Sequence, residues 1–250
     1  MNKIIINADD CGKSVDVNEA INQAIEKGLI TSTTVMANMD DLEGALALYR
    51  KWNGKISFGV HLNITEGHPL VPSPILLDTK FCIPKSDGMV FNKLHFLYRY
   101  PSKDLKIAVY LELKAQIERI LDCGIKISHI DSHRHMHLGP FLLPIVCRVA
   151  KEYGIIKIRH SRNRLGYSLR DFKERGLNLY RKTVMNDMIS TDVFCAVSEY
   201  STIMKKDDKT YELMCHPGHP NPKYVNEMLF LEDIISHNLR NCRLITYNDL

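Results

Sequence analysis

The stretch Lys3-Ile4-Ile5-Ile6-Asn7-Ala8-Asp9-Asp10-Cys11-Gly12 decides the fold, because it joins an apolar run to two carboxylates and a glycine. An unbroken β-branched run is typical of a parallel strand that is buried on both faces. Asp9 and Asp10 then stand at the carboxyl end of this strand, where α/β sheets and barrels place their chemistry. Neighbouring residues point in different directions, so one acid can bind a metal while the other accepts a proton. The alternative is that both acids only shape the turn and cap the next helix.

Strand-like and helix-like segments alternate along the rest of the chain. Apolar residues recur at helical spacing from Val17 to Ile25, and Gly28 ends this helix. Further strands are predicted at 32–37, 56–62, 126–130, 155–158, 191–197, 211–215 and 243–247, and further helices at 40–49, 103–121, 140–153, 181–190 and 228–239. Between 163 and 180 we expect a loop with a short helix. Some seven β-α alternations indicate a single parallel barrel, closed or nearly closed, that spans residues 1–250.

From Pro69 to about Ser102 the alternation lapses into prolines, an Asp-Gly pair and scattered aromatic residues. A segment of this length inside an α/β domain is usually a lid or a substrate-binding insertion, so we expect one at about 69–102. Its aromatic side chains can stack on the apolar faces of sugar rings, or they can pack the insertion against the barrel. They are Phe81, Phe91, Phe96, Tyr98 and Tyr100.

The composition narrows the class of protein. The net charge is +4 and the Lys and Arg residues are scattered, which does not indicate nucleic-acid binding. No apolar stretch approaches the roughly 20 residues of a membrane span, so we expect a cytoplasmic protein without membrane contact. The seven cysteines are odd in number and include no C-x-x-C pair, which predicts reduced thiols. A homodimer is the default expectation, because two-fold dimers are the commonest soluble assemblies.

Polar residues that can bind a metal recur where the predicted strands end. In a barrel these ends form one rim, so residues that are distant in sequence meet in one cleft. Two imidazoles and one carboxylate leave coordination positions open for water and substrate, and we predict Asp10, His61 and His133 as that set. Such ligands suit zinc, whereas an oxygen-rich site suits magnesium, manganese or cobalt. Asp131 can bind the metal or orient a histidine from outside the ligand set.

Histidines cluster at positions 129, 133, 135 and 137. We expect His133 to be the metal ligand of this group, with His135 and His137 forming hydrogen bonds or touching substrate. The alternative is a polar loop whose imidazoles bond to the backbone.

Two further residues at strand ends are candidates for the site. His216 lies in a Cys-His-Pro-Gly turn, which can hold an imidazole at a reacting atom or can be an ordinary tight turn. Arg159 can pair with Asp9 and keep it ionised, bind substrate, or lie at the surface.

Five motifs together resemble the YdjC-like carbohydrate deacetylases. They are Asn7-Ala8-Asp9-Asp10-x-Gly12, Thr31-Ser32-Thr33-Thr34, Gly59-x-His61-Leu62, His129-Ile130-Asp131-Ser132-His133-x-His135-x-His137 and Cys215-His216-Pro217, in the family's order. The resemblance implies a distorted (β/α) barrel of the glycoside hydrolase/deacetylase type, with about seven parallel strands. It also implies one divalent metal ion and the removal of acetyl groups from N-acetylated sugars such as chitooligosaccharides.

The resemblance assigns roles by position. Asp10, His61 and His133 resemble the family's metal ligands, Asp9 its general base and His216 its general acid. Cys11 departs from the pattern, because the family often has an aromatic residue there. We therefore expect a hydrolase that acts on carbon-nitrogen bonds other than peptide bonds, with a small acetylated sugar as its substrate.

Three alternatives differ from this expectation in class. A glycosidase would use Asp9 and Asp131 as paired carboxylates. A metal-dependent phosphoesterase would need a basic cradle, for which only Arg134 and Arg159 are near the rim. A non-catalytic sugar-binding barrel would be expected to have lost Asp9 or His216, and this chain retains both.

Overall fold

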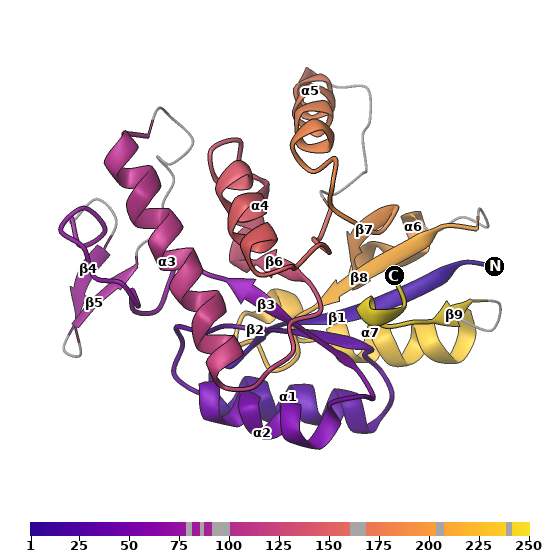
Figure 1. Cartoon of the computed structure of the whole chain (residues 1–250). Coiled ribbons are helices and arrows are strands. Elements are labelled where there is room, and N and C mark those ends of the chain that lie inside the picture. The colour runs from indigo at the N-terminus through magenta and orange to yellow at the C-terminus, as the bar shows by residue number, and fades with distance from the viewer. Residues whose placement is uncertain (79–81, 86–87, 92–100, 161–168, 204–207, 239–241) are drawn as a thin grey trace.

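The computed structural model of the protein describes residues 1–78, 82–85, 88–91, 101–160, 169–203, 208–238 and 242–250. Its centre is a seven-stranded parallel sheet in the order β6-β3-β2-β1-β8-β7, with β9 paired to β1. The strands are β1 (Lys3–Cys11), β2 (Ser32–Val35), β3 (Ser57–Leu62), β6 (Ile130–Ser132), β7 (Val193–Ala196), β8 (Thr210–Cys215) and β9 (Arg243–Leu244). The sheet curls into an incomplete barrel, which confirms the predicted distorted (β/α) barrel (Figure 1).

The first strand is the centre of this sheet. β1 lies between β2 and β8, and it is buried from Ile4 to Cys11. Ile4 and Ile6 pack into the main core, whereas Ile5 packs with Ile245 on the opposite face. This burial on both faces confirms the expectation drawn from the apolar run.

β1 continues through both acids to Cys11, so Asp9 and Asp10 lie at the carboxyl end of the strand, as the sequence predicts. Its pairing with β2 shifts register between Ala8 and Cys11, and Asp10 adopts a positive φ of 69° within this irregularity. A bulge of this kind bends a strand and re-aims its side chains. The two adjacent carboxylates consequently meet different partners.

Helices cover the sheet on more than one side. α1 (Val15–Glu26) and α2 (Leu42–Trp52) lie side by side along one flank, and α3 (Lys103–Asp122) packs against α4 (Leu142–Glu152) (Figure 1). Ser14 and Asp41 cap the first two helices through their side-chain oxygens. The other helices are α5 (Leu169–Val184), α6 (Tyr200–Ile203) and α7 (Glu227–Asp233), together with short turns at His133–Leu138, Val197–Glu199, Pro222–Tyr224, Ile234–Asn238 and Tyr247–Asp249.

Several predicted elements have different bounds in the structure. The strand expected at 126–130 is β6 (Ile130–Ser132), and 155–158 pairs only through the single bridges Ile130–Ile158 and Lys157–Ile189. The strand expected at 243–247 ends at Leu244. Strand length depends on the partner segment, which local sequence does not specify. The bounds expected for the loop at 163–180 and the helix at 181–190 are wrong where the structure describes these residues, because α5 is one helix from Leu169 to Val184. It packs against α4 and continues through Gly176, a residue that lowers helix propensity.

The described part of the 69–102 insertion contains an antiparallel hairpin of β4 (Cys82–Lys85) and β5 (Gly88–Phe91). Phe91 is buried in the main core, and its backbone N–H donates to the Gly67 carbonyl oxygen at 2.9 Å. For Phe91 the packing alternative is therefore correct. The other four aromatic residues, Phe81, Phe96, Tyr98 and Tyr100, lie outside the described residues. A lid or substrate-binding role of the insertion stays a prediction.

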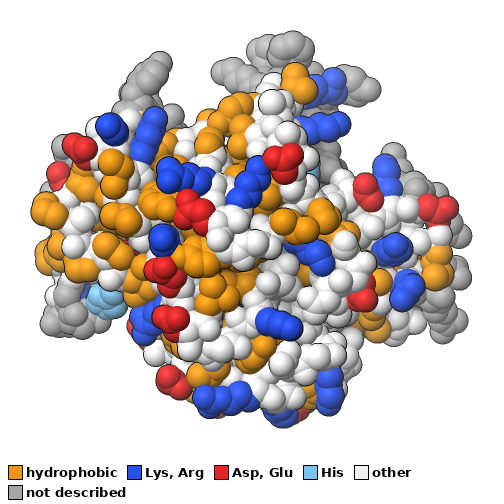
Figure 2. Space-filling model, viewed as in Figure 1, with side chains coloured by type: hydrophobic (Ala, Val, Ile, Leu, Met, Phe, Trp, Pro, Cys, Tyr) orange, Lys and Arg blue, Asp and Glu red, His pale blue; other side chains and the backbone are white. Residues whose placement is uncertain are grey.

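The surface carries mixed charges, and the cysteines form no disulfides. Lys, Arg, Asp and Glu side chains are interspersed on the face that Figure 2 shows. No disulfide joins any of the seven cysteines, and five of them are buried. No helix within the described segments is long and apolar enough to cross a membrane.

Gly59 offers a test of packing next to the site. A Cβ added to Gly59 would lie 2.5 Å from Cε1 and 2.8 Å from the carbonyl oxygen of His129, which is fully buried. We expect Gly59→Ala to lower the free energy of unfolding by about 1–3 kcal/mol, because this close approach forces the backbone apart. Gly176→Ala is the control, since nothing lies within 4 Å of its added Cβ. In urea titrations of both variants, Gly176→Ala should raise the free energy of unfolding by up to about 1 kcal/mol. An unchanged free energy of unfolding for Gly59→Ala would show that the backbone there tolerates the added methyl group.

Candidate active site

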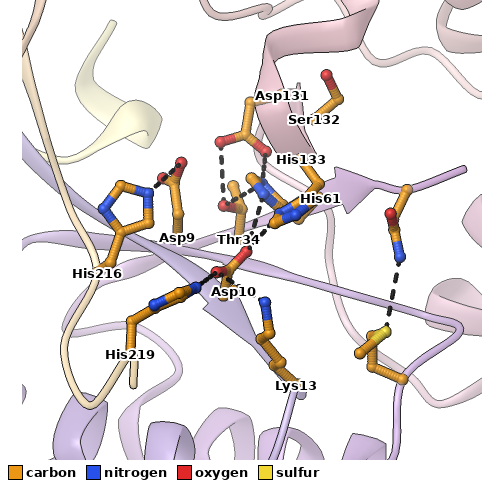
Figure 3. Close-up of polar contacts among 12 residues, drawn as sticks. Asp9, Asp10, Lys13, Thr34, His61, Asp131, Ser132, His133, His216 and His219 are labelled. Atoms are coloured by element: carbon orange, nitrogen blue, oxygen red, sulfur yellow. Dashed lines mark hydrogen bonds and ion pairs between the residues drawn. The ribbon is translucent and has the colours of Figure 1, made fainter. Parts of the chain in front are cut away.

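The carboxyl ends of the strands bring the predicted residues together in one cavity of about 330 Å³ (Figure 3). Six of them line it: Asp9, Asp10, His61, His133, His135 and His216. Arg134, Met214, His219, Lys223 and Tyr224 complete the lining. The ends of parallel strands thus form one rim, as the sequence predicts.

Three of these side chains could hold a metal ion. The ligand atoms of Asp10, His61 and His133 all lie within 4.8 Å of one another. Oδ1 of Asp10 is 3.3 Å from Nε2 of His61 and 3.0 Å from Nδ1 of His133. Oδ2 of Asp10 is buried and has no hydrogen-bond partner among the described residues. One carboxylate with an open oxygen and two imidazoles fit a divalent cation.

Asp9, His61 and Asp131 form a second group with suitable spacing for a metal. Arg159 already neutralises this group. Its Nη1 donates to Asp9 at 2.8 Å and lies 2.8 Å from Oδ2 of Asp131, while its Nη2 donates to Asp9 at 2.7 Å. A guanidinium in contact with both carboxylates repels a further cation. The group around Asp10 is therefore the better metal site.

Charge pairing sets the protonation of the two central residues. Burial alone would raise the pKa of Asp9, but the Arg159 guanidinium holds it well below its usual range. Asp9 is therefore ionised at neutral pH and can accept a proton. Burial alone would lower the pKa of His61, but the Asp131 carboxylate and other neighbouring acids raise it to about 10. Nδ1 of His61 donates to Asp131 at 2.6 Å, so Asp131 orients this imidazole.

Two fully buried residues join these groups, and the sequence analysis assigned no role to either. The Thr34 hydroxyl donates to Asp131 at 3.1 Å and lies 3.1 Å from Nδ1 of His61. The Asn7 amide donates to Asp9 at 2.8 Å and to the Thr34 hydroxyl at 3.2 Å. Asn7 ends the apolar run of β1, and that contrast is the signal by which it could have been found. Thr34 lies in β2 beside Ser32 and Thr33, so the sequence offers no such signal for it.

His216 faces Asp9 across the cavity. Its Nε2 lies 4.0 Å from Oδ2 of Asp9 (Figure 3). Glu227 of α7 accepts a hydrogen bond from the His216 backbone N–H at 2.5 Å, and the same carboxylate oxygen lies 3.4 Å from Nδ1. The Tyr224 ring packs against the imidazole with a centroid distance of 4.1 Å. These contacts fix the ring, and Nε2 is the nitrogen that approaches Asp9.

His219 is a site residue to which the sequence analysis assigned no role. Its Nε2 lies 3.9 Å from Oδ2 of Asp10. It follows His216 by three residues in the same turn, and this spacing was the available signal.

The other predicted residues occupy different places. His135 lines the cavity, whereas His137 is fully buried beneath it. Nε2 of His137 donates to the Arg159 carbonyl oxygen at 3.2 Å, and Nδ1 lies 2.6 Å from the Ser132 hydroxyl. Arg159 has no exposed surface, so the surface alternative is wrong. Substrate contact by these residues stays a prediction.

Backbone strain is concentrated at this site. Three of the four non-glycine residues with positive φ in the described segments belong to it: Asp10 at 69°, Arg134 at 55° and His135 at 54°. Such a conformation costs roughly 1–2 kcal/mol per residue and persists only where the surroundings enforce it. At Arg134 and His135 it belongs to the turn that lines the cavity.

A family model described as YdjC-like protein matches residues 3–245. The chain belongs to the YdjC-like family. It is 34% identical to a protein of Vibrio campbellii named carbohydrate deacetylase, over 86% of this chain and 78% of that protein. It is 30% identical to a carbohydrate deacetylase of Clostridium beijerinckii, over 99% of this chain and all of that protein.

A solved structure from Enterococcus faecalis V583, described as a proposed cellobiose-phosphate cleavage protein, has the same fold as this YdjC-like chain. The two superpose with a TM-score of 0.74 and 22% identity, over 99% of this chain and 98% of the other.

The strain at Arg134 can be measured directly. Arg134→Gly and Arg134→Ala remove the same side chain, but only glycine adopts a positive φ without a Cβ penalty. We expect the glycine variant to have a higher free energy of unfolding than the alanine variant, by about 0.5–1 kcal/mol in chemical denaturation. Equal values for the two variants would show that the backbone at Arg134 is not strained.

The buried His137 predicts a loss of stability in acid. Burial lowers its pKa to about 3, against about 6.5 for an unfolded chain. Between these two pKa values His137 is protonated only in the unfolded state. Its contribution to stability is therefore complete above about pH 6.5 and is lost as pH falls toward 3. The slope from this residue is at most about 1.4 kcal/mol per pH unit. In urea titrations, the free energy of unfolding should differ less between about pH 7 and pH 5 for His137→Gln than for the wild type. An equal difference in the two proteins would show that His137 is not responsible for the loss.

Proposed function

We propose that this protein is a metal-dependent hydrolase that removes acetyl groups from N-acetylated sugars such as chitooligosaccharides. The observation that carries the proposal is an ionised Asp9 beside the Asp10, His61 and His133 group, with His216 across one cavity. Relatives named carbohydrate deacetylase, and a 31% identical relative from Escherichia fergusonii named chitooligosaccharide deacetylase, support the reaction and the substrate class.

In this proposal Asp10, His61 and His133 hold one divalent ion, with zinc or magnesium expected ahead of manganese or cobalt. The ion supplies positive charge that polarises the acetamide carbonyl and makes water more acidic.

The chain's own residues then move the protons. Asp9 accepts a proton from water as the water oxygen bonds to the carbonyl carbon. Arg159 holds Asp9 by two hydrogen bonds and fixes its direction. Protonated His216 donates from Nε2 to the amine nitrogen as the carbon-nitrogen bond breaks, because an amine is a poor leaving group until it is protonated. The Glu227 carboxylate lies 3.4 Å from Nδ1 and holds the ring with Nε2 toward Asp9. The products are acetate and the free amino sugar.

The geometry disfavours the glycosidase alternative. That reaction needs one carboxylic acid to protonate the leaving oxygen. Asp9 and Asp131 are instead both paired with the Arg159 guanidinium, which holds the pKa of Asp9 well below its usual range.

Acetate release from N,N′-diacetylchitobiose tests the proposal. The wild type should release acetate, lose this activity with a chelator and regain it when a divalent metal is restored. Asp9→Asn and His216→Ala should each lower turnover by about 10²–10⁴-fold, because each removes a proton-transfer group. Asp16→Asn, an exposed acid on α1, is the control and should keep normal turnover. Reducing ends without acetate would establish a glycosidase, and near-normal turnover in either site variant would refute its assigned role.

A further inference from the structure

The turn at 63–67, directly after β3, is built on buried hydrogen bonds. The Asn63 side-chain oxygen accepts from the backbone N–H groups of Thr65 at 3.0 Å and Glu66 at 3.3 Å. The Asn63 amide nitrogen donates to the Glu66 carbonyl oxygen at 2.8 Å. Gln116 of α3 bonds to both the N–H and the C=O of Asn63, at 2.9 and 2.6 Å. Asn63 and Gln116 have no exposed surface, so this turn is held rigidly.

The turn places the Glu66 carboxylate beside His133, in an adjoining cavity that Lys13 and His133 also line. Oε1 of Glu66 lies 3.2 Å from Nε2 of His133 and accepts a hydrogen bond from Lys13 at 2.6 Å. Nδ1, the other ring nitrogen of His133, lies 3.0 Å from Oδ1 of Asp10. The imidazole therefore stands between two carboxylates, with one at each nitrogen.

His61 has the same arrangement. Its Nε2 lies 3.3 Å from Oδ1 of Asp10, and its Nδ1 lies 2.6 Å from Oδ1 of Asp131. Each candidate ligand thus presents one nitrogen to Asp10 and the other to an outer carboxylate. In metal sites such a carboxylate accepts the N–H of the ligand, which fixes its tautomer and its ring orientation.

We propose that Glu66 is a positioning residue of the metal centre, which accepts the Nε2–H of His133 and keeps the Nδ1 lone pair directed toward Asp10. The inference rests on the metal site of the proposed function. Lys13 balances the charge of Glu66 and also lies 3.6 Å from Oδ2 of Asp10. It thereby connects the turn after β1 with the turn after β3.

Metal affinity tests this role without any turnover. Zinc chloride would be titrated calorimetrically into the metal-stripped full chain. We expect Glu66→Ala to weaken the affinity about 10–100-fold. Glu66→Gln should lose less, since its amide oxygen can still accept the Nε2–H. Glu43→Ala, at an exposed position of α2, should bind like the wild type. Thermal unfolding of each variant checks the fold.

The Lys13→Met variant distinguishes two roles of Glu66: orientation of the His133 ring, and an ion pair with Lys13 alone. Removing this cation should leave zinc affinity equal or higher, because a positive charge near the site is lost. A loss as large as that of Glu66→Ala would overturn the proposal, since Glu66 would then act only through Lys13. Equal affinity of Glu66→Ala and wild type would overturn it too. Nitrogen-15 chemical shifts give a second readout: His133 should carry its proton on Nε2 in the wild type, and a proton on Nδ1 would refute the assignment.

The two proposals fail differently. A wild type that binds zinc but releases no acetate refutes the deacetylase function and leaves the role of Glu66 intact. If the wild type binds zinc and releases acetate, and Glu66→Ala binds zinc equally well, only the role of Glu66 is refuted. A wild type that binds neither zinc nor another divalent ion refutes both.

Discussion

One buried guanidinium organises this molecule. Arg159 has no exposed surface, and its Nε, Nη1 and Nη2 meet carboxylates that stand on β8, β6 and β1: Glu212, Asp131 and Asp9. Removing such charges from water costs several kcal/mol per ion unless each is paired with good geometry. The cluster is a weak source of stability for this reason. The cluster instead constrains the geometry of the sheet, because β1, β6 and β8 must keep their relative positions for every ion pair to form.

The network continues on the same face of the sheet, toward the amino ends of the strands, because Glu212 pairs in register with Ile5 of β1. Glu212 accepts a hydrogen bond from the Tyr247 hydroxyl at 2.5 Å, and the Tyr247 ring stacks on His129 with a centroid distance of 3.5 Å. Burial raises the pKa of Glu212 to about 7, because desolvation outweighs the attraction of Arg159. A satisfied polar network of this kind specifies one arrangement of the interior more strictly than apolar packing does. It thereby fixes the direction of Asp9 from below.

Two adjacent acids acquire different chemistry from their surroundings. Asp9 is hydrogen-bonded to the Arg159 guanidinium, whereas Oδ1 of Asp10 faces the imidazoles of His61 and His133. Oδ2 of Asp10 has no hydrogen-bond partner among the described residues, and Lys13 lies 3.6 Å from it. The register shift in β1 and the positive φ of Asp10 make this separation, because a regular strand would not aim the two side chains in this way. The strain is offset by the rigid sheet on both sides of β1.

The sequence by itself determined the buried first strand, the barrel of parallel strands and the meeting of Asp10, His61 and His133 at one rim. These follow from local periodicity and from the rule that parallel strands share their carboxyl ends. Only the tertiary structure decided what Arg159 and His137 contact, and it alone revealed Thr34, Glu66 and Glu212 as parts of the site. Their partners lie between 22 and 97 residues away along the chain. A local pattern reports that a residue is buried, but the identity of its neighbour depends on strand register and side-chain packing across the whole fold.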